Sequence, residues 1–192
     1  QLDEDYEIWF LADSHIIMED GSEDEQTKAY AAERKPAFAN ETGYSSDVIF
    51  SQFIDKANEQ KPDLVLFGGD IIDFPSEANV AFLTSELQRL TVPYRMAYGN
   101  HDWTFPWEYM TETGSATSRP MIEDIMSGNS PEFEDMTVVA IDNSSNQVAP
   151  EALAALDQAY DAGKPIILLQ HVPLSTEELI AKAKENWTNP VT

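Results

Sequence analysis

The sequence predicts an α/β domain of alternating strands and helices, with its chemistry at the strand ends. Apolar runs typical of buried strands alternate with segments of helical periodicity along most of the 192 residues. Four short polar clusters follow directly after four of these apolar runs, and together they hold all three histidines of the chain. Because α/β folds bind ligands where strand ends converge, we expect these clusters to form one site.

Five apolar runs are expected to form the strands of this domain. They cover residues 8–12, 64–67, 94–98, 137–141 and 166–169. The last run is apolar at every position, which is typical of a strand buried on both faces. The helical segments between the runs favour a layered arrangement of strands and helices.

Two helices are expected in the first half of the chain. The first starts at Ser46 or Asp47 and ends before Pro62, because proline cannot continue a helix. Its apolar face comprises Ile49, Phe50, Phe53, Ile54 and Ala57. The second starts at Ser76, and its apolar stripe comprises Val80, Leu83, Leu87 and Leu90.

Two further helices are expected in the second half. One covers residues 150–162 and has Gly163 directly after its end. The last starts at the capping box that includes Ser175 and Glu178. Residues 16–45 and 103–135 show no strong periodicity and are expected to be irregular, with the acidic run 19–25 as a solvated loop.

The composition fits one globular domain with a strongly acidic surface. Hydrophobic residues make up 42% of the chain, which excludes disorder as its main state. Lys and Arg number 11 against 35 Asp and Glu, so the formal net charge is −24. This charge repels nucleic-acid backbones and anionic membranes, and we expect neither as a bulk partner. No apolar run approaches the roughly 20 residues of a membrane span.

The absence of cysteine excludes disulfides, cysteine-ligated zinc and iron–sulfur clusters. A cysteine-free, very acidic chain fits an exported or cell-surface bacterial protein better than a cytoplasmic one. The chain begins at Gln1 rather than Met, so a signal peptide or anchor removed upstream would fit this expectation. A Walker-type phosphate loop and a Gly-x-Ser-x-Gly elbow are both absent. The oligomeric state stays open.

The first two clusters offer carboxylates and one imidazole. Asp13 and His15 lie on a segment expected to be extended, so their side chains should point the same way, about 7 Å apart at Cα. Gly69 lets the backbone turn sharply after a buried strand and brings Asp70 close to a ligand. A carboxylate in that place is suited to bridging two cations. Asp73 is expected to orient a neighbouring imidazole.

The third and fourth clusters add an amide and two imidazoles. Asn100 offers a neutral oxygen ligand, while the adjacent His101 points elsewhere and can donate a proton to a leaving group. His171 follows a buried strand, which ends before Pro173. Taken singly, each cluster also fits a turn, a cap or a buried histidine. Taken together, the four clusters predict a two-metal hydrolytic site.

Aromatic side chains follow the third cluster directly. Trp103, Phe105 and Trp107 occupy alternate positions of a segment that lacks regular periodicity. They either pack over the sheet edge or form one wall of a substrate cleft. Both interpretations stay open at this point.

In their order and spacing, the four clusters resemble four of the five motif blocks of the calcineurin-like metallophosphoesterase superfamily. The blocks are Asp13-Ser14-His15, Gly69-Asp70-Ile71-Ile72-Asp73, Gly99-Asn100-His101-Asp102 and His171-Val172-Pro173. The similarity extends from about Tyr6 to Leu174. It implies that residues 1–192 form a metallophosphoesterase domain, a four-layer αββα sandwich with the metals at its strand ends.

The resemblance also implies a role for each site residue. The metal ligands would be Asp13 and His15 for the first ion, Asn100 and His171 for the second, and Asp70 as a bridge between both. His101 would donate a proton to the leaving alkoxide, with Asp73 positioning it. The cofactors would be two divalent transition metal ions (Fe, Mn or Zn), and a hydroxide bridging them would attack phosphorus in line. The substrate would be a small-molecule phosphate ester, either a monoester or a diester.

One block of the superfamily is absent. Its last block, Gly-His-x-His, normally gives one further histidine to each metal, yet no histidine follows His171 and the sequence ends at Thr192. Each metal would then have three protein ligands, counting Asp70 for both. We therefore expect a C-terminally incomplete domain that lacks the last strands of the sandwich. It is either part of a longer protein, which we favour, or a shortened relative with weakened metal binding.

Two functions compete on this evidence. The leading one is metal-dependent hydrolysis of a phosphoric ester, with specificity set by the loops of residues 16–45 and 103–135. The alternative is a catalytically weak or inactive module of the same fold that binds a partner. A nuclease of this fold is disfavoured by the charge of −24 and the lack of basic patches.

Overall fold

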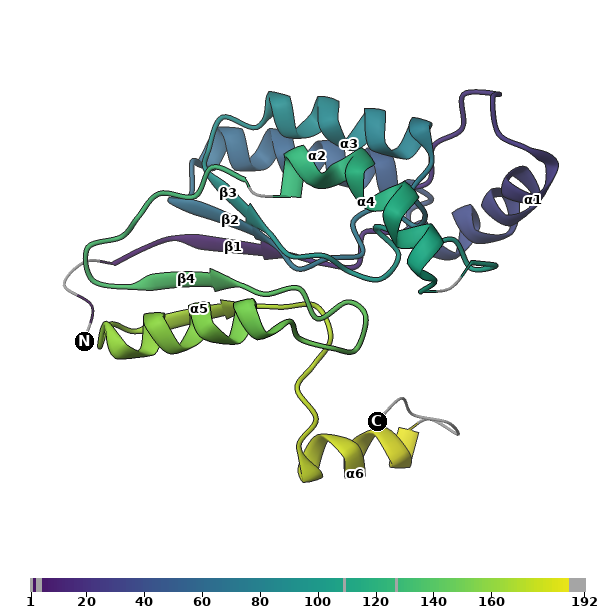
Figure 1. Ribbon diagram of the computed structural model, residues 1–192. Helices are drawn as coiled ribbons and strands as arrows, with labels where there is room; N and C mark the ends of the chain where they lie inside the picture. The colour runs from purple at the N-terminus through teal and green to yellow at the C-terminus, as the bar shows by residue number, and fades with distance from the viewer. Residues whose placement is uncertain (1, 3–4, 109, 127, 187–192) are drawn as a thin grey trace.

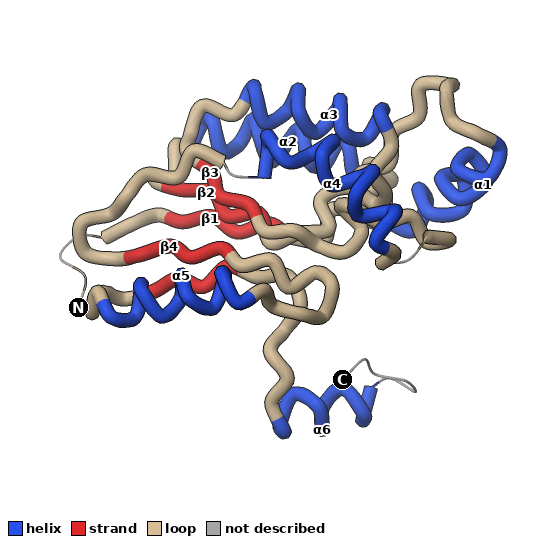
Figure 2. Tube along the Cα trace, viewed as in Figure 1, coloured by secondary structure: helices blue, strands red, loops and turns tan. Residues whose placement is uncertain are grey.

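The computed structural model describes residues 2, 5–108, 110–126 and 128–186. Within these residues, five strands form two sheets, accompanied by six α-helices and one 3-10 helix (Figure 2). Strands and helices alternate along much of the chain, as predicted. None of the helices in this part of the chain is long and apolar enough to cross a membrane.

All strands of each sheet run parallel. The larger sheet contains β1 (Ile8–Leu11), β2 (Leu64–Phe67) and β3 (Tyr94–Met96) in that spatial order. The smaller sheet pairs β4 (Thr137–Ala140) with β5 (Ile166–Leu169). The five predicted strands are therefore confirmed, and β1, β3 and β4 end one or two residues earlier than predicted.

The sheets and helices form four layers (Figure 1). Helices α2 (Ser46–Gln60), α3 (Glu77–Arg89) and α4 (Glu112–Met126) cover one face of the larger sheet. The smaller sheet lies against the other face, and α5 (Pro150–Asp161) covers its outer side. This order of layers is the αββα sandwich that the family resemblance implied.

The side chains of β2 show why the layers form. Val65 and Phe67 belong to the core that the larger sheet shares with the helices. Leu64 and Leu66 alternate with them and pack with Leu169 of the smaller sheet. Because successive strand residues point to opposite faces, a strand that is apolar throughout must be covered on both sides.

Several helix boundaries follow the predicted signals. α2 spans the predicted residues, and its C-cap Lys61, directly after Gln60, has a left-handed backbone. The hydroxyl of Ser76 accepts a hydrogen bond from the backbone N–H of Asn79 and so caps α3. α5 ends at Asp161, one residue earlier than predicted, and Gly163, which follows its C-cap Ala162, has φ +70°. These local signals placed the helices correctly.

The first segment without periodicity nevertheless contains a helix. α1 (Glu25–Arg34) is followed at once by the 3-10 helix η1 (Lys35–Phe38), so the expectation of irregular structure was wrong here. Only Thr27 and Ala31 are buried in α1, which leaves no apolar stripe in the sequence. Asp24 caps α1, so the acidic run forms a loop only up to this residue.

The second such segment contains α4, and the expectation was wrong there too. Its buried residues are spaced four apart along the helix: Gly114, Ser118, Ile122 and Met126. Half of them are small or polar, and Pro120 lies among them. The buried positions follow the helical period, but two of the four are not apolar side chains, so the sequence shows no apolar stripe there.

The last helix begins slightly later than predicted. α6 (Glu177–Asn186) buries none of its residues. Thr176 Oγ1, rather than the hydroxyl of Ser175, accepts the hydrogen bond from the backbone N–H of Leu179, at 3.2 Å. The N-cap is therefore one residue later than predicted, and the residue three positions after it is Leu179 instead of the glutamate of a capping box.

Candidate metal centre

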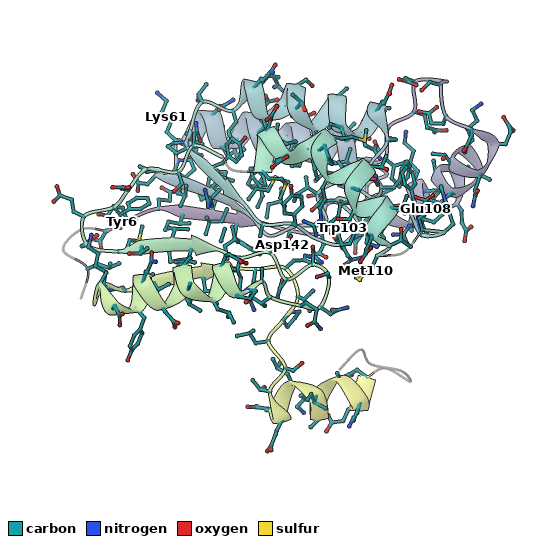
Figure 3. The ribbon with its side chains drawn as sticks, in the orientation of Figure 1. Tyr6, Lys61, Trp103, Glu108, Met110 and Asp142 are labelled. Carbon is teal, nitrogen blue, oxygen red and sulfur yellow. The ribbon has the colours of Figure 1, made fainter. Side chains whose placement is uncertain are left out.

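The four polar clusters lie at the carboxyl ends of the strands. Figure 3 shows Trp103 and Asp142 toward this end of the molecule and Tyr6 at the opposite end of the sheets. The loops that follow β1 and β2 run side by side there. The backbone N–H of Asp13 donates to the carbonyl of Gly69 at 3.0 Å, and that of His15 donates to the carbonyl of Asp70 at 3.0 Å. The first two clusters are thus joined through their backbones.

The loops after β3 and β5 reach the same place. The backbone N–H of His101 donates to Oδ1 of Asp70 at 2.9 Å. Nδ1 of His171 donates to the carbonyl of Gly68 at 2.9 Å, which connects the smaller sheet to the larger one. The expectation that the four clusters meet in one site is confirmed by these contacts.

Three of the predicted ligands have a left-handed backbone. The φ angles of Asp13, His15 and Asp70 are +55°, +45° and +52°. Such angles are uncommon outside glycine, cost on the order of 1–3 kcal/mol each and cluster at functional sites. The expectation that Asp13 and His15 lie on an extended segment was therefore wrong. Left-handed turns, not strand alternation, set the directions of these two side chains.

Two glycines allow the second and third clusters to approach each other. Gly69 has φ +89°, and a Cβ added there would lie 2.5 Å from the backbone N of Gly99. A Cβ on Gly99 would overlap the backbone N and the carboxylate of Asp70. The close approach predicted at Gly69 is therefore matched by a second glycine on the opposite loop.

The carboxylate and imidazole groups form two overlapping sets with the spacing of metal ligands. One set is His15, Asp70 and His101; the other is Asp13, Asp70 and His171. Within each set, one donor atom per residue lies within 4.8 Å of the others. Asp70 belongs to both sets and is only 5% exposed. Oxygen and imidazole donors together fit divalent Fe, Mn or Zn, so the chemistry of these residues suits a metal centre.

These sets overlap the predicted ligand set without reproducing its pairs. Asp13 and His15 fall into different sets, and each is grouped with Asp70 and a further histidine. Asn100 lies in the loop beside His101, and its backbone carbonyl accepts a hydrogen bond from Thr104 Oγ1 at 2.7 Å. The assignment of individual ligands to individual ions therefore stays a prediction.

In all three histidines, Nδ1 is engaged by an oxygen atom, and Nε2 is the ring nitrogen left for the site. Nδ1 of His171 is bonded to the carbonyl of Gly68, and Nδ1 of His101 lies 2.8 Å from the carbonyl of Asp73. Nδ1 of His15 lies 2.7 Å from the carboxylate of Asp73. Because each acceptor is an oxygen, each Nδ1 bears the hydrogen, and Nε2 remains for a metal or for proton transfer.

Asp70 and His171 each stabilise the charged form of the other. Burial opposes ionisation of Asp70, yet the hydrogen bond and charge of His171 hold the pKa of Asp70 below its usual value. Burial likewise opposes protonation of His171, but the neighbouring carboxylate of Asp70 raises the pKa of His171 to about 9. Their side chains form an ion pair, with Nε2 and Oδ2 3.2 Å apart. A metal that binds here has to displace this proton.

Asp73 contacts two imidazoles rather than one. Its side chain is fully buried, and of the two imidazoles its carboxylate lies closer to that of His15, with Oδ1 2.7 Å from Nδ1. For His101, the nearer atom of Asp73 is the backbone carbonyl at 2.8 Å, while Oδ1 lies at 3.4 Å. Burial raises the pKa of Asp73, but hydrogen bonds from His15 and Arg34 hold it below its usual value overall. The sequence predicted that Asp73 orients one imidazole, and its contact with His15 was missed.

Asp102 joins the second and third clusters, a role that the sequence did not suggest. Its carboxylate is fully buried and accepts hydrogen bonds of 2.8–3.1 Å from four backbone N–H groups, those of Gly99, Asp70, Ile71 and Ile72. Burial, with the charge of Asp70, raises the pKa of Asp102 to about 7, against the lowering effect of these N–H groups. Its place beside His101 was the only signal in the sequence.

Asn143 holds the fourth cluster in place. Its Oδ1 accepts hydrogen bonds from the backbone N–H groups of His171, at 3.2 Å, and Val172, at 3.0 Å. Its Nδ2 donates to the carbonyl of Val172 at 2.6 Å. Asn143 follows the strand predicted over residues 137–141, so its position at a strand end was a usable signal.

The aromatic residues after the third cluster divide into two environments. Phe105 and Trp107 contact each other, and they pack against Phe74 and Tyr30 respectively. Trp103 is buried, and its indole N–H donates to Ser144 Oγ at 2.8 Å. Packing of the loop is therefore observed for all three predicted residues.

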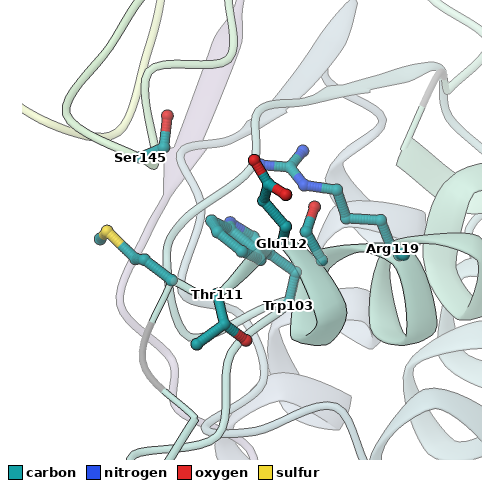
Figure 4. A pocket seen from close by; sticks show the side chains of 8 residues that line it. Trp103, Thr111, Glu112, Arg119 and Ser145 are labelled. Atoms are coloured by element: carbon teal, nitrogen blue, oxygen red, sulfur yellow. The ribbon is translucent and has the colours of Figure 1, made fainter.

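Trp103 also borders an open pocket beside the third cluster (Figure 4). Thr111, Glu112 and Arg119 of the α4 region line one part of it, and Ser145 lines another. The guanidinium of Arg119 lies over the indole ring of Trp103, 4.3 Å from its centroid. Of the three candidates for a substrate wall, Trp103 alone lines this pocket. A substrate role for Trp103 stays a prediction.

Comparison with known proteins bears on the site as a whole. A family model described as calcineurin-like phosphoesterase matches residues 6–189. The match includes all four polar clusters and nearly the full length of the chain. No curated protein matches the chain significantly.

Proposed function

Because the chain belongs to the calcineurin-like phosphoesterase family, we propose that it hydrolyses a phosphoric ester at a dinuclear metal centre. The proposal rests on Asp70, whose carboxylate belongs to both groups of potential ligands. A carboxylate shared between two ligand sets is what a bridge between two cations requires. The family supports phosphoesterase chemistry in general, and the two-ion centre is our more specific interpretation.

Five residues are proposed to hold the ions. They are Asp13 and His15 for the first, Asn100 and His171 for the second, and Asp70 for both. When bound, two such ions would supply an activated hydroxide as nucleophile and neutralise charge on the phosphoryl oxygens. Fe, Mn and Zn all fit these donors.

His101 is proposed to protonate the leaving group. Its Nδ1 donates to the carbonyl of Asp73, so the protonated ring offers the hydrogen on Nε2. The side chain is 25% exposed, which leaves it accessible to a substrate. The proton passes from Nε2 to the alkoxide oxygen as the bond between that oxygen and phosphorus breaks, and water restores it afterwards.

The proposed substrate is a small-molecule phosphate ester. A net charge of −24 repels a polyanion over long distances, which disfavours nucleic acids. A small ester presents one or two phosphoryl charges, and metal cations bound at the strand ends would reverse the local field. The acidity of the chain is therefore compatible with a small substrate that reaches a metal centre.

Hydrolysis of chromogenic esters tests this proposal. The purified protein, loaded with Mn²⁺ or Zn²⁺, should hydrolyse 4-nitrophenyl phosphate or bis(4-nitrophenyl) phosphate. Removal of the metal by a chelator should abolish turnover, and its return should restore it. Turnover that persists after the metal is removed would contradict the proposal. So would a fully metal-loaded protein that hydrolyses neither ester.

A second candidate is a partner-binding module with weak or no catalysis. It is favoured by the number of ligands, because the five proposed residues give each ion only three donors, counting Asp70 for both. Weak metal binding would follow from so few donors. Protein that shows no metal above background and gains no activity from added metal would support this candidate.

A further inference from the structure

An arginine outside the four clusters binds the buried carboxylate of Asp73. Arg34 is the last residue of α1. Its Nε donates to Oδ2 of Asp73 at 3.0 Å, and its Nη2 donates to Oδ1 at 2.6 Å. This two-point geometry is the strong form of an arginine–carboxylate pair and fixes the plane of the carboxylate.

The same carboxylate binds a predicted metal ligand. Oδ1 of Asp73, which accepts from Arg34, also lies 2.7 Å from Nδ1 of His15. On the other side of that ring, Nε2 of His15 lies 3.8 Å from Oδ2 of Asp70. Contacts therefore run from the guanidinium through Asp73 and the imidazole to the centre of the site.

The segment that contains Arg34 also covers the imidazole. The ring of Phe38 stacks on the ring of His15, with centroids 4.3 Å apart and planes 15° apart. The guanidinium of Arg34 lies 4.7 Å from the Phe38 centroid and 5.5 Å from that of Tyr30. Both rings hold the arginine in place by cation–π contact. η1 therefore contacts His15 directly through Phe38, and α1 reaches it indirectly, through Arg34 and Asp73.

We propose that Arg34 is a positioning residue of the metal centre, which fixes Asp73 so that Asp73 holds His15 with Nε2 toward the metal. The inference rests on the proposed metal function. Carboxylates that orient a ligating histidine typically change metal affinity or activity by about 10–100-fold when they are mutated. Arg34 controls the position of such a carboxylate from a segment that the sequence indicated as irregular.

Metal affinity of variants tests the inference. Arg34→Gln should weaken binding of at least one ion by about 10–100-fold, measured by equilibrium dialysis of Mn²⁺ or Zn²⁺ against metal-stripped protein. Arg34→Lys should restore only part of the loss, because an ammonium cannot bind both oxygens with the arginine geometry. When Asp73→Asn is already present, adding Arg34→Gln should weaken metal binding little further, because both residues act on the metal through the contact between Asp73 and His15.

Arg89→Gln is the matched control. Arg89 is the last residue of α3, as Arg34 is of α1, and it pairs with Asp55 and Glu86 instead of a site residue. It should retain wild-type metal affinity. Wild-type affinity in Arg34→Gln, or a loss that persists in full in the Asp73→Asn background, would overturn the inference. A raised KM at unchanged metal affinity would overturn it as well, because it would identify a substrate contact.

A measurement on metal-free protein separates this inference from the proposed function. The ring N–H of His15 that donates to Asp73 should give a protected downfield proton resonance by NMR. The resonance should be lost or exchange faster in Arg34→Gln and be retained in Arg89→Gln. An unchanged resonance in Arg34→Gln overturns the positioning role. Failure of wild-type protein to bind any metal overturns the proposed function instead.

Discussion

Among the residues of the site, His101 has geometry suited to an acid rather than to a buried ligand alone. Its Nδ1 is held by a backbone carbonyl, and a quarter of its side chain is exposed. We predict that His101→Ala lowers turnover by about 10²–10⁴-fold, the usual contribution of a positioned acid, while both metals remain bound. The loss should be greater for an alkyl phosphate than for a 4-nitrophenyl ester, whose leaving group needs no proton.

Steady-state kinetics on both esters, together with metal analysis of the variant, check this prediction. Equal losses on the two esters would argue against proton donation, and full activity would remove His101 from the mechanism. Loss of metal in the variant would reassign His101 as a ligand, as its grouping with His15 and Asp70 would permit.

The ion pair between His171 and Asp70 makes metal binding depend on pH. Asp70 raises the pKa of His171 to about 9, so the imidazole is protonated at neutral pH before metal binds. A ligating imidazole must be neutral, and binding therefore releases this proton below pH 9. Apparent affinity should rise with pH, by up to about tenfold per unit, and level off above pH 9.

Titration calorimetry of metal binding, in buffers of different ionisation enthalpy, measures how many protons the protein releases when it binds metal at pH 7. His171→Gln should release about one proton fewer than wild type. Equal release by the two proteins would show that His171 gives up no proton on binding.

At the scale of secondary-structure elements, Asp102 joins the loops that follow β2 and β3. Its carboxylate accepts four backbone N–H groups from these loops and is fully buried. We predict that Asp102→Ala lowers the free energy of unfolding by about 3–5 kcal/mol, because buried donors are left without partners. Urea denaturation measures the change.

Asp63→Ala is the control for this variant. Asp63 is exposed, and its carboxylate accepts the backbone N–H of Glu7 at 2.8 Å. The control should lose about 1 kcal/mol or less. If Asp102→Ala also lowered the free energy of unfolding by only about 1 kcal/mol or less, the carboxylate of Asp102 would not be what stabilises the two joined loops.

The elements that could be predicted from sequence are those with local signals. Strands β2 and β5 are apolar at every position, and α3 has both an apolar stripe and a capping serine. α1 buries only Thr27 and Ala31, and half of the buried residues of α4 are small or polar, so neither helix gave an apolar period. Their helical structure therefore depends on tertiary packing that a local pattern does not report.

The predicted site residues divide in the same way. Asp70 and the three histidines lie in the loops that follow the strands, so the alternation of elements located them. Arg34 and Asp102 act across sequence separations of 39 and 32 residues. Side chains that act over such distances leave no spacing to detect, and only the folded chain shows what they hold.

At the scale of the whole molecule, two parallel sheets deliver four loops to one edge. The larger sheet brings the loops after β1, β2 and β3 together, and the smaller sheet adds His171 through its contact with Gly68. Both helix layers lie on the outer faces of the sheets (Figure 1). Arg34 of α1, Phe38 of η1 and the start of α4 lie close to the strand ends. The four-layer fold thus creates a concentration of carboxylates and imidazoles around Asp70.

The number of ions bound around Asp70 tests the central claim most directly. Native mass spectrometry should count Mn²⁺ or Zn²⁺ on metal-stripped wild-type protein, and on Asp70→Asn, as the metal is returned. We predict two ions per chain in the wild type, hydrolysis that appears only when both are bound, and loss of both ions in Asp70→Asn. A wild type that binds fewer than two ions, or an Asp70→Asn variant that retains both, would contradict the account.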